Sequence, residues 1–292
     1  MFKIVSDSGC DLTQEEITQN DVNIVPFYIS LNGNDFLKEE VDITKEAFFN
    51  QLATDKKLFP KTSQPNPQDY IDTYEPLLKA GHDVLVVTIS SGASGSHASA
   101  VLAKTQMEEE YPQRKIIVLD SLCGSVTQGL IIKEITKVRA LGKTIEETAA
   151  IAEQIIKTAK LYIAVDNLEY MKKGGRVGST TAMVGTVLGL RPILHAVNGK
   201  IEQLETVRGR KKSLQLIGDA MVGALTENIS VAEISVGHIL SEEEATGFKE
   251  DLEKRLSTTI NNPVASMGAT LGAHMGPGGM VFGYCKSHKA FV

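Results

Sequence analysis

The sequence has few of the features that build disulfide frameworks, membrane spans or nucleic-acid interfaces. Its 292 residues include three cysteines, Cys10, Cys123 and Cys285, which lie far apart and form no CxxC pair. This pattern predicts reduced thiols and a cytoplasmic location. No apolar run approaches 18 residues and no secretory leader is recognised, so we expect neither a membrane span nor export. The formal net charge of -6 argues against a nucleic-acid partner.

Nucleotide and metal motifs are missing as well. Gly142-Lys143-Thr144 matches the end of a phosphate-binding P-loop, but Lys137 stands where its first glycine belongs. No GxGxxG pattern follows a predicted strand. Cys285 and His288 form one isolated pair, without a second pair at the spacing of metal ligands. We therefore expect neither a metal ion nor a cofactor.

The chain does contain the pattern of a two-domain α/β protein. Hydrophobic residues make up 42% and charged residues 23%, which is typical of a globular protein of this length. Apolar strands alternate with amphipathic helices through residues 1–160, which predicts a doubly wound, mostly parallel sheet. Residues 161–292 combine strands, a hairpin and separate helices, which predicts a second, α+β domain. The polar ends of the strands in the first domain are expected at one edge of the sheet, where open α/β folds bind ligands.

Local signals predict where several elements begin and end. An Asn198-Gly199 pair predicts a hairpin turn, and the apolar stretch 23–31 predicts a single strand. Helix starts are predicted by an Asp11 or Thr13 cap, by Asn66-Pro67, and by the capping boxes Thr144-x-x-Glu147 and Ser241-x-x-Glu244.

The stretch Val84–Ala100 is the clearest candidate for a binding site. It reads as an apolar strand, a Ser/Gly turn over residues 90–96 and then a helix. The amides of a helix N-terminus and the hydroxyls of such a turn suit a small oxyanion, because no lysine or arginine lies between Lys79 and Lys104. An ordinary loop that caps its own helix explains the same residues equally well.

A second candidate is the segment around Thr62. Three prolines in residues 60–67 exclude a regular helix and a central strand. The chain is expected to run extended here and to present its hydroxyls outside any ladder. A rigid surface linker is the alternative interpretation.

A hydrolase is an alternative interpretation of the Ser/Gly turn. Gly92-Ala93-Ser94-Gly95-Ser96 differs by one residue from the G-x-S-x-G nucleophile elbow, and His274 follows in the expected chain order. The final glycine is absent, however, and no acid stands clearly before His274. A lone histidine between glycines is also often a packed residue.

Five motifs together resemble those of the DegV family over the whole chain and in the family's order. They are Ser6-Asp7-Ser8, Thr62-Ser63-Gln64-Pro65, the Ile89–Ser96 turn, the Leu168–Gly178 segment with Gly174-Gly175-Arg176, and His274-x-Gly276-Pro277-Gly278. The resemblance implies a two-domain bacterial protein that binds a long-chain fatty acid between its domains, as a carrier and not as a catalyst. Some family members present the acid to a fatty acid kinase resembling dihydroxyacetone kinase, which makes an acyl phosphate.

The resemblance also implies roles for single residues. Thr62 and Ser94, with Ser63, Gly95 and nearby amides, would hold the carboxylate, and His274 would lie close to it. Arg176 would lie at the carboxylate entrance and take part in the phosphotransfer step.

Physical chemistry is compatible with these implied roles. Hydroxyl and amide donors can hold a carboxylate without a formal charge, and burying about 15 methylenes is worth on the order of 12 kcal/mol before the costs of association. The apolar residues proposed for the acyl tunnel are Met183, Val187, Leu190, Ile193 and Met267. A lipid sensor without a kinase partner remains a further alternative.

Overall fold

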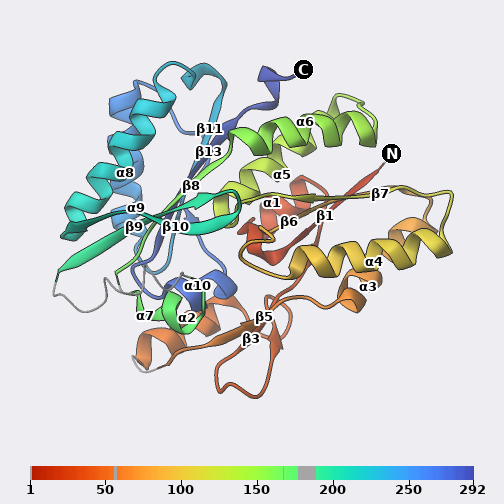
Figure 1. Cartoon of the computed structure of the whole chain (residues 1–292), viewed down its shortest axis with the longest axis horizontal. Coiled ribbons are helices and arrows are strands. Elements are labelled where there is room, and N and C mark those ends of the chain that lie inside the picture. Colours follow the sequence, from red (N-terminus) through yellow and green to blue (C-terminus); the bar gives the residue numbers. More distant parts are fainter. Residues whose placement is uncertain (1, 56–57, 167, 177–188) are drawn as a thin grey trace.

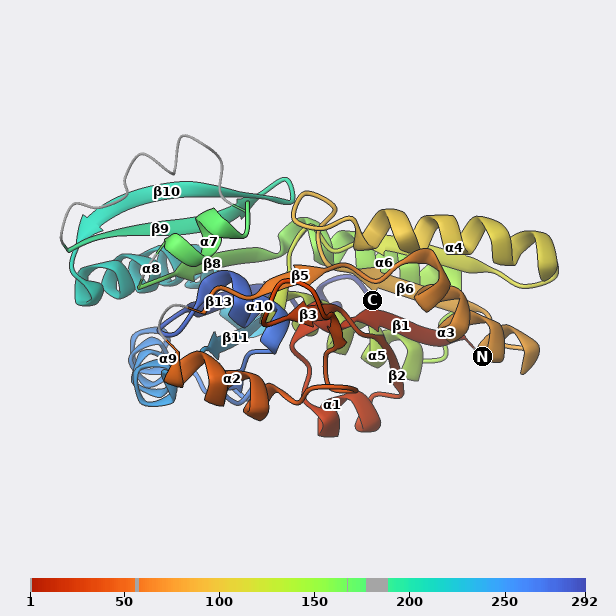
Figure 2. The same ribbon diagram turned by 90° about the horizontal axis from the view of Figure 1, so that it is seen from below.

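The structure is a computed structural model that describes residues 2–55, 58–166, 168–176 and 189–292. Within these ranges three sheets form the framework, and the two larger ones lie at opposite ends of the elongated molecule in Figure 2. The mixed α/β architecture with one parallel and one mixed sheet confirms the predicted fold class. In the described part of the chain no helix is long and apolar enough to cross a membrane.

The first sheet is parallel throughout and has the order β2-β1-β6-β7. Its central strand β6 is buried on both faces, because helices cover both sides of the sheet. The strands are β1 (Lys3–Asp7), β2 (Val22–Val25), β6 (Val84–Thr88) and β7 (Ile116–Asp120). One face packs against α3 (Pro67–Lys79) and α4 (Ser96–Glu110), and the other against α5 (Ser125–Ala140) and α6 (Ile145–Thr158).

The second sheet has the order β10-β9-β8-β13-β11-β12 and is mostly antiparallel. Two helices, α8 (Arg210–Leu225) and α9 (Glu242–Leu256), pack on one face around Ile193 and Phe282. The strands are β8 (Lys160–Ala164), β9 (Leu190–Val197), β10 (Lys200–Arg208), β11 (Ala232–His238), β12 (Ala265–Ser266) and β13 (Met280–Lys286). The predicted domain boundary, between residues 160 and 161, falls after the first residue of β8.

A small third sheet corrects two expectations. Its strands β4 (Leu37–Lys38), β3 (Tyr28–Ser30) and β5 (Lys61–Ser63) are antiparallel. The single strand predicted over 23–31 is wrong: it breaks at Pro26, which has no N–H for the ladder, and β3 joins the small sheet. The expectation that Thr62 lies outside any ladder is also wrong, because Thr62 pairs with Ile29.

Most of the predicted helix starts and the hairpin are confirmed. Thr13, Asn66 and Thr144 each cap a helix, and each forms a full capping box. The Asn198-Gly199 turn has positive φ at both residues, as a type I′ hairpin requires. The prediction of a capping box at Ser241 is wrong. Its hydroxyl donates to Ile239 O instead, and the Glu244 carboxylate binds the Arg210 guanidinium.

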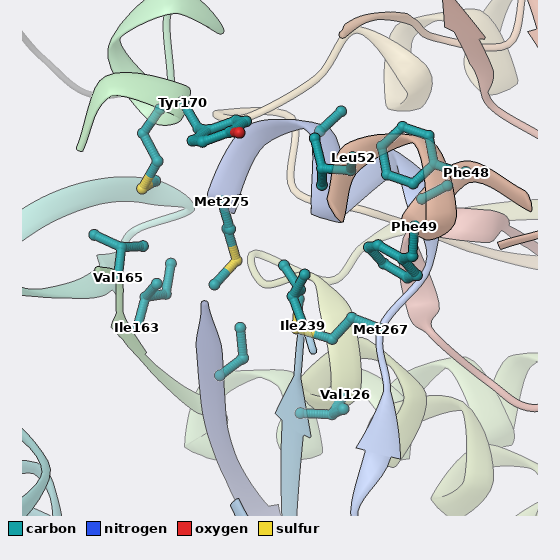
Figure 3. Close-up of a cluster of buried hydrophobic side chains, with 14 of the residues drawn as sticks. Phe48, Phe49, Leu52, Val126, Ile163, Val165, Tyr170, Ile239, Met267 and Met275 are labelled. Atoms are coloured by element: carbon teal, nitrogen blue, oxygen red, sulfur yellow. The ribbon is translucent and has the colours of Figure 1, made fainter. Parts of the chain in front are cut away.

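One apolar core joins the two halves of the sequence. In Figure 3, Phe48 and Phe49 of α2 (Lys45–Thr54) lie near Met267, and Met275 lies between them and strand β8. Met275 ends the short helix α10 (Ala269–Met275). Figure 1 shows α10 close to α2 and to α7 (Glu169–Lys173). This core holds α10, and with it His274, between the small sheet and the second sheet.

Candidate functional site

A mostly apolar cavity lies where the carboxyl ends of β6 and β7 meet the second sheet. Its volume is about 90 Å³. The apolar side chains that line it include Phe27, Ile89, Leu122, Leu161, Ile163, Met171, Ala196, Ile201, Leu271, Met275 and Val281. Such a lining favours an apolar ligand over water.

Polar side chains gather at one end of this cavity. Thr62, Ser94, Arg176 and His274 all line it, although they come from four separate segments. Their hydroxyl, guanidinium and imidazole groups are suited to an anionic group. The site is therefore amphipathic, with a polar end and an apolar body.

The Ser/Gly turn is built around its own backbone hydrogen bonds. Ser90 N–H donates to Cys123 O at 2.7 Å, and the N–H groups of Ala93 and Ser94 both donate to Ser90 O. The remaining N–H groups of residues 90–96 also have acceptors: Asp120, Ser90 Oγ, Gln64 Oε1 and Ser94 Oγ. In this conformation the turn therefore offers hydroxyls, rather than these amides, to a ligand.

Asp7 of the Ser6-Asp7-Ser8 motif holds the Ser/Gly turn in place by hydrogen bonds. Its carboxylate accepts the Ile89 N–H at 2.9 Å and the Ser96 hydroxyl at 2.7 Å. Gln128 donates to the same carboxylate at 3.1 Å. Burial raises the pKa of Asp7 above its usual value, and these hydrogen bonds oppose that rise. The motif thus has a positioning role that its sequence alone did not reveal.

Ser94 and Thr62 are the two hydroxyl donors at the polar end. Ser94 Oγ accepts the Ser96 N–H at 3.2 Å, and no acceptor for its own proton is found among the described residues. Thr62 Oγ1 lies 2.7 Å from His274 Nε2. Because β5 holds Thr62 in the ladder with β3, its side chain is fixed toward the cavity.

His274 is held in its neutral form. Burial, and secondarily the positive charge of Arg176, lowers the pKa of His274 to about 4. Its Nδ1 is buried and has no hydrogen-bond partner in the described part of the chain. Gly174 packs against this atom so closely that a Cβ at position 174 would lie 2.2 Å from Nδ1. The first glycine of the Gly174-Gly175-Arg176 motif is thus required by contact with His274.

This low pKa makes a prediction about stability. In the unfolded chain a histidine titrates near pH 6.5. Above that pH the side chain is neutral in both states. Below it the unfolded state binds a proton that folded His274 does not, so the free energy of unfolding falls as the pH falls toward 4. Between pH 7 and pH 4 the wild type should lose about 2–3 kcal/mol more unfolding free energy than His274→Gln. Urea unfolding of both proteins at several pH values measures this. If the free energies of unfolding of the two proteins change equally with pH, His274 is not buried as described.

Arg176 reaches the same end of the cavity from the loop after α7. Its Nε donates to Ala93 O at 3.4 Å, and its Nη1 donates to Gly174 O. Burial lowers its pKa, but the residue as a whole remains exposed. The guanidinium therefore bridges the Ser/Gly turn and the Gly-Gly loop at the mouth of the site.

The other predicted carboxylate residues lie at the edge of this site. Ser63 is exposed, and its hydroxyl donates to Gln64 O, because alternate side chains of β5 point to opposite faces. Gly95 donates its N–H to Gln64 Oε1 at 2.9 Å. Neither residue is among those that line the cavity.

Two of the predicted tunnel residues, Met183 and Val187, lie outside the described residues. The other three do not line the cavity. Leu190 begins β9 away from the cavity, Ile193 is buried against α8 and α9, and Met267 is buried in the core of Figure 3. The residues that do line the cavity include Leu161 and Ile163 of β8. Their two-residue spacing was the available signal, but the sequence did not show which face of β8 borders a cavity.

Among the residues that the structure describes, the relay of a serine hydrolase is not found. The hydrogen bond of His274 Nε2 is to Thr62, and within the described residues no carboxylate orients Nδ1. No group of three or more metal-ligating side chains occurs in the described part of the chain. What the arrangement offers chemically is hydrogen-bond donors for an anion beside an apolar cavity.

Comparison with known proteins agrees with this geometry. The sequence model described as an uncharacterised protein of the DegV family matches residues 1–287. A DegV domain-containing protein of Clostridium perfringens is 30% identical over 286 residues, covering 97% of this chain and 98% of its own.

Solved structures match as closely. A stearic acid-binding protein from Eubacterium ventriosum aligns with a TM-score of 0.94 and 31% identity, covering 100% of both chains. A fatty acid-binding DegV family protein from Thermus thermophilus aligns with a TM-score of 0.87 and 28% identity, covering 98% of this chain and 99% of its own.

Fold and site together define a class of α/β proteins with a polar-ended apolar cavity between a parallel and a mixed sheet. Both the sequence match and the structural likeness extend over nearly the whole chain. The chain belongs to the DegV family.

Proposed function

We propose that this protein binds a long-chain fatty acid, with the carboxylate at Thr62 and Ser94 and the acyl chain in the apolar cavity. The observation that carries the proposal is the convergence of Thr62, Ser94, Arg176 and His274 at one end of a cavity whose lining is mostly apolar. The relatives named above that bind stearic or another fatty acid share the fold over their full length.

The tautomer of neutral His274 decides the role of Thr62. With the proton on Nε2, His274 donates to Thr62 Oγ1, and the Thr62 hydroxyl then keeps its own proton for the ligand. The opposite tautomer would take that proton and leave only lone pairs facing a carboxylate. The proposed function therefore requires the Nε2–H tautomer, in which His274 positions Thr62 as a donor.

Part of the cavity wall is adaptable. Met171 and Met275 line the cavity, and methionine side chains re-pack around ligands more readily than branched ones. We expect these two side chains to move when the acyl chain enters.

Calorimetric titration with palmitate, together with an assay of p-nitrophenyl ester hydrolysis, tests this proposal. We expect saturable 1:1 binding of palmitate and no turnover above that of a Ser94→Ala control. Ester turnover that disappears in Ser94→Ala, without binding of palmitate, would replace the carrier with an acyl hydrolase.

The position of Arg176 supports the further proposal that the bound acid is presented to a fatty acid kinase in the cytoplasm. Its exposed guanidinium lies beside the polar end, where it can stabilise the charge of a transferring phosphoryl group. Arg176→Ala should leave palmitate affinity within about threefold and lower acyl phosphate formation by roughly 10²-fold or more. Calorimetry and a coupled kinase assay measure the two quantities.

The matched control is Lys212→Ala, which removes an exposed cation of α8 and should change neither quantity. An equal loss of binding and transfer in Arg176→Ala would show that Arg176 only maintains the site.

A further inference from the structure

Two buried carboxylates behind the cavity wall have no part in holding the ligand carboxylate. Glu39 is 2% exposed and accepts three hydrogen bonds. Its Oε2 accepts the Ser8 hydroxyl at 2.6 Å and the Thr270 hydroxyl at 2.7 Å, and its Oε1 accepts the Thr270 N–H at 2.9 Å. The separation of 231 residues between Glu39 and Thr270 makes this contact a link between distant parts of the chain.

Asp11 completes the same network from the loop after β1. Its Oδ2 accepts the Ser125 hydroxyl at 2.6 Å, and its Oδ1 accepts the Gly268 N–H at 2.8 Å. A Cβ at position 268 would lie 2.6 Å from Glu39 Oε1, so the glycine lets the backbone approach both carboxylates. Asp11 and Glu39 thus hold the chain at the start of α10, one helical turn before His274.

The residues held by this network separate two cavities. Ser125 and Thr270 line the acyl cavity, as does Phe27, whose N–H donates to Ser8 Oγ at 3.0 Å. On the other side, Asp11 and Glu39 line an outer groove of about 680 Å³, together with Ser8 and Gly268. The hydrogen bonds of the two carboxylates therefore run through a thin partition between the acyl cavity and the groove.

The chemistry of the network calls for acceptors at positions 11 and 39. Two of the five groups that reach the carboxylates are backbone N–H groups, which only donate, and three are hydroxyls. Burial raises the pKa of both acids, to about 7 for Asp11, and the hydrogen bonds oppose this rise. The charge of Glu39 adds to the rise for Asp11 and that of Lys45 opposes it, while Glu40 adds to the rise for Glu39. Keeping such buried acids costs folding stability, which favours a role in shaping the site.

We propose that Asp11 and Glu39 are positioning residues that make this partition rigid and so limit the length of the acyl chain that binds. The inference rests on the proposed function. The acyl cavity has one adaptable side, at Met171 and Met275, and one side fixed by the carboxylate network. An acyl chain that is too long for the adaptable side reaches the partition, which prevents it from extending into the outer groove.

Calorimetric titration of saturated acids with 16, 20 and 22 carbons tests this on the full-length wild type, Glu39→Ala and Asp11→Ala. Each substitution removes both acceptor oxygens and leaves a backbone N–H, that of Thr270 or of Gly268, without its partner. We expect the wild type to bind the 22-carbon acid at least tenfold more weakly than palmitate, and each variant to reduce that ratio at least fivefold. The matched control is Glu134→Ala, since Glu134 is a buried carboxylate with several donors far from the cavity.

The outcomes separate the two proposals. If the wild type binds no fatty acid, the proposed function itself is overturned. If it binds all three lengths equally, or if folded Glu39→Ala and Asp11→Ala keep the wild-type ratio, fatty acid binding stands and the partition is overturned. An equal change of the ratio in Glu134→Ala would also overturn it, because the effect would then follow from stability alone.

Discussion

Octanoate should bind this protein roughly 10²–10⁴-fold more weakly than palmitate. The two acids share the same carboxylate and therefore the same contacts at Thr62 and Ser94. They differ by eight methylenes, each worth about 0.8 kcal/mol when buried, which gives on the order of 6 kcal/mol before the cost of ordering the chain. Most of the affinity is thus expected to come from the apolar cavity. Calorimetry below the micellar concentration of each acid measures the ratio.

1-Hexadecanol is the control for this result, because it keeps the sixteen-carbon chain and removes the charge. It should bind more tightly than octanoate but more weakly than palmitate. Equal affinities for octanoate and palmitate would contradict the assignment of the cavity to the acyl chain, and would indicate a site for the carboxylate alone.

Removing either hydroxyl at the polar end should weaken palmitate binding by about 1–3 kcal/mol, or roughly 5–150-fold. Thr62→Ala and Ser94→Ala each leave a buried carboxylate oxygen without a donor. Thr62→Ala also removes the hydrogen-bond partner of His274 Nε2, which lies 2.7 Å from Thr62 Oγ1. Titration of palmitate into each variant measures the effect.

Thr62→Ser is the matched control, because it keeps the hydroxyl and deletes only a methyl group. We expect it to retain affinity within a few fold of the wild type. If Thr62→Ala and Ser94→Ala both bind palmitate as the wild type does, the carboxylate is held elsewhere, and Arg176 becomes the first residue to test.

Signals that act within a few residues could be read from the sequence. The strand, turn and helix around Ser94 follow from a buried apolar run that ends in serines and glycines. Thr13, Asn66 and Thr144 cap helices because their side chains reach backbone amides three residues away. The Asn198-Gly199 hairpin follows from the positive φ that both positions accept.

Features that depend on distant packing could not be read in this way. Ile193 and Leu194 are neighbours in an apolar strand, yet Ile193 packs under α8 and Leu194 joins the core on the opposite face. A period of two cannot tell which face borders a ligand when both faces are buried. The bonds from Glu39 to Thr270 and from Asp11 to Gly268 span 231 and 257 residues, and no local pattern indicates them.

The most direct test of fatty acid binding is native mass spectrometry of the protein as purified from bacteria, followed by denaturing extraction. We predict a complex heavier than the chain by the mass of one long-chain fatty acid, in near-stoichiometric amount, with the acid recovered on extraction. A mass equal to that of the chain alone, unchanged after incubation with oleate and palmitate, would contradict the account.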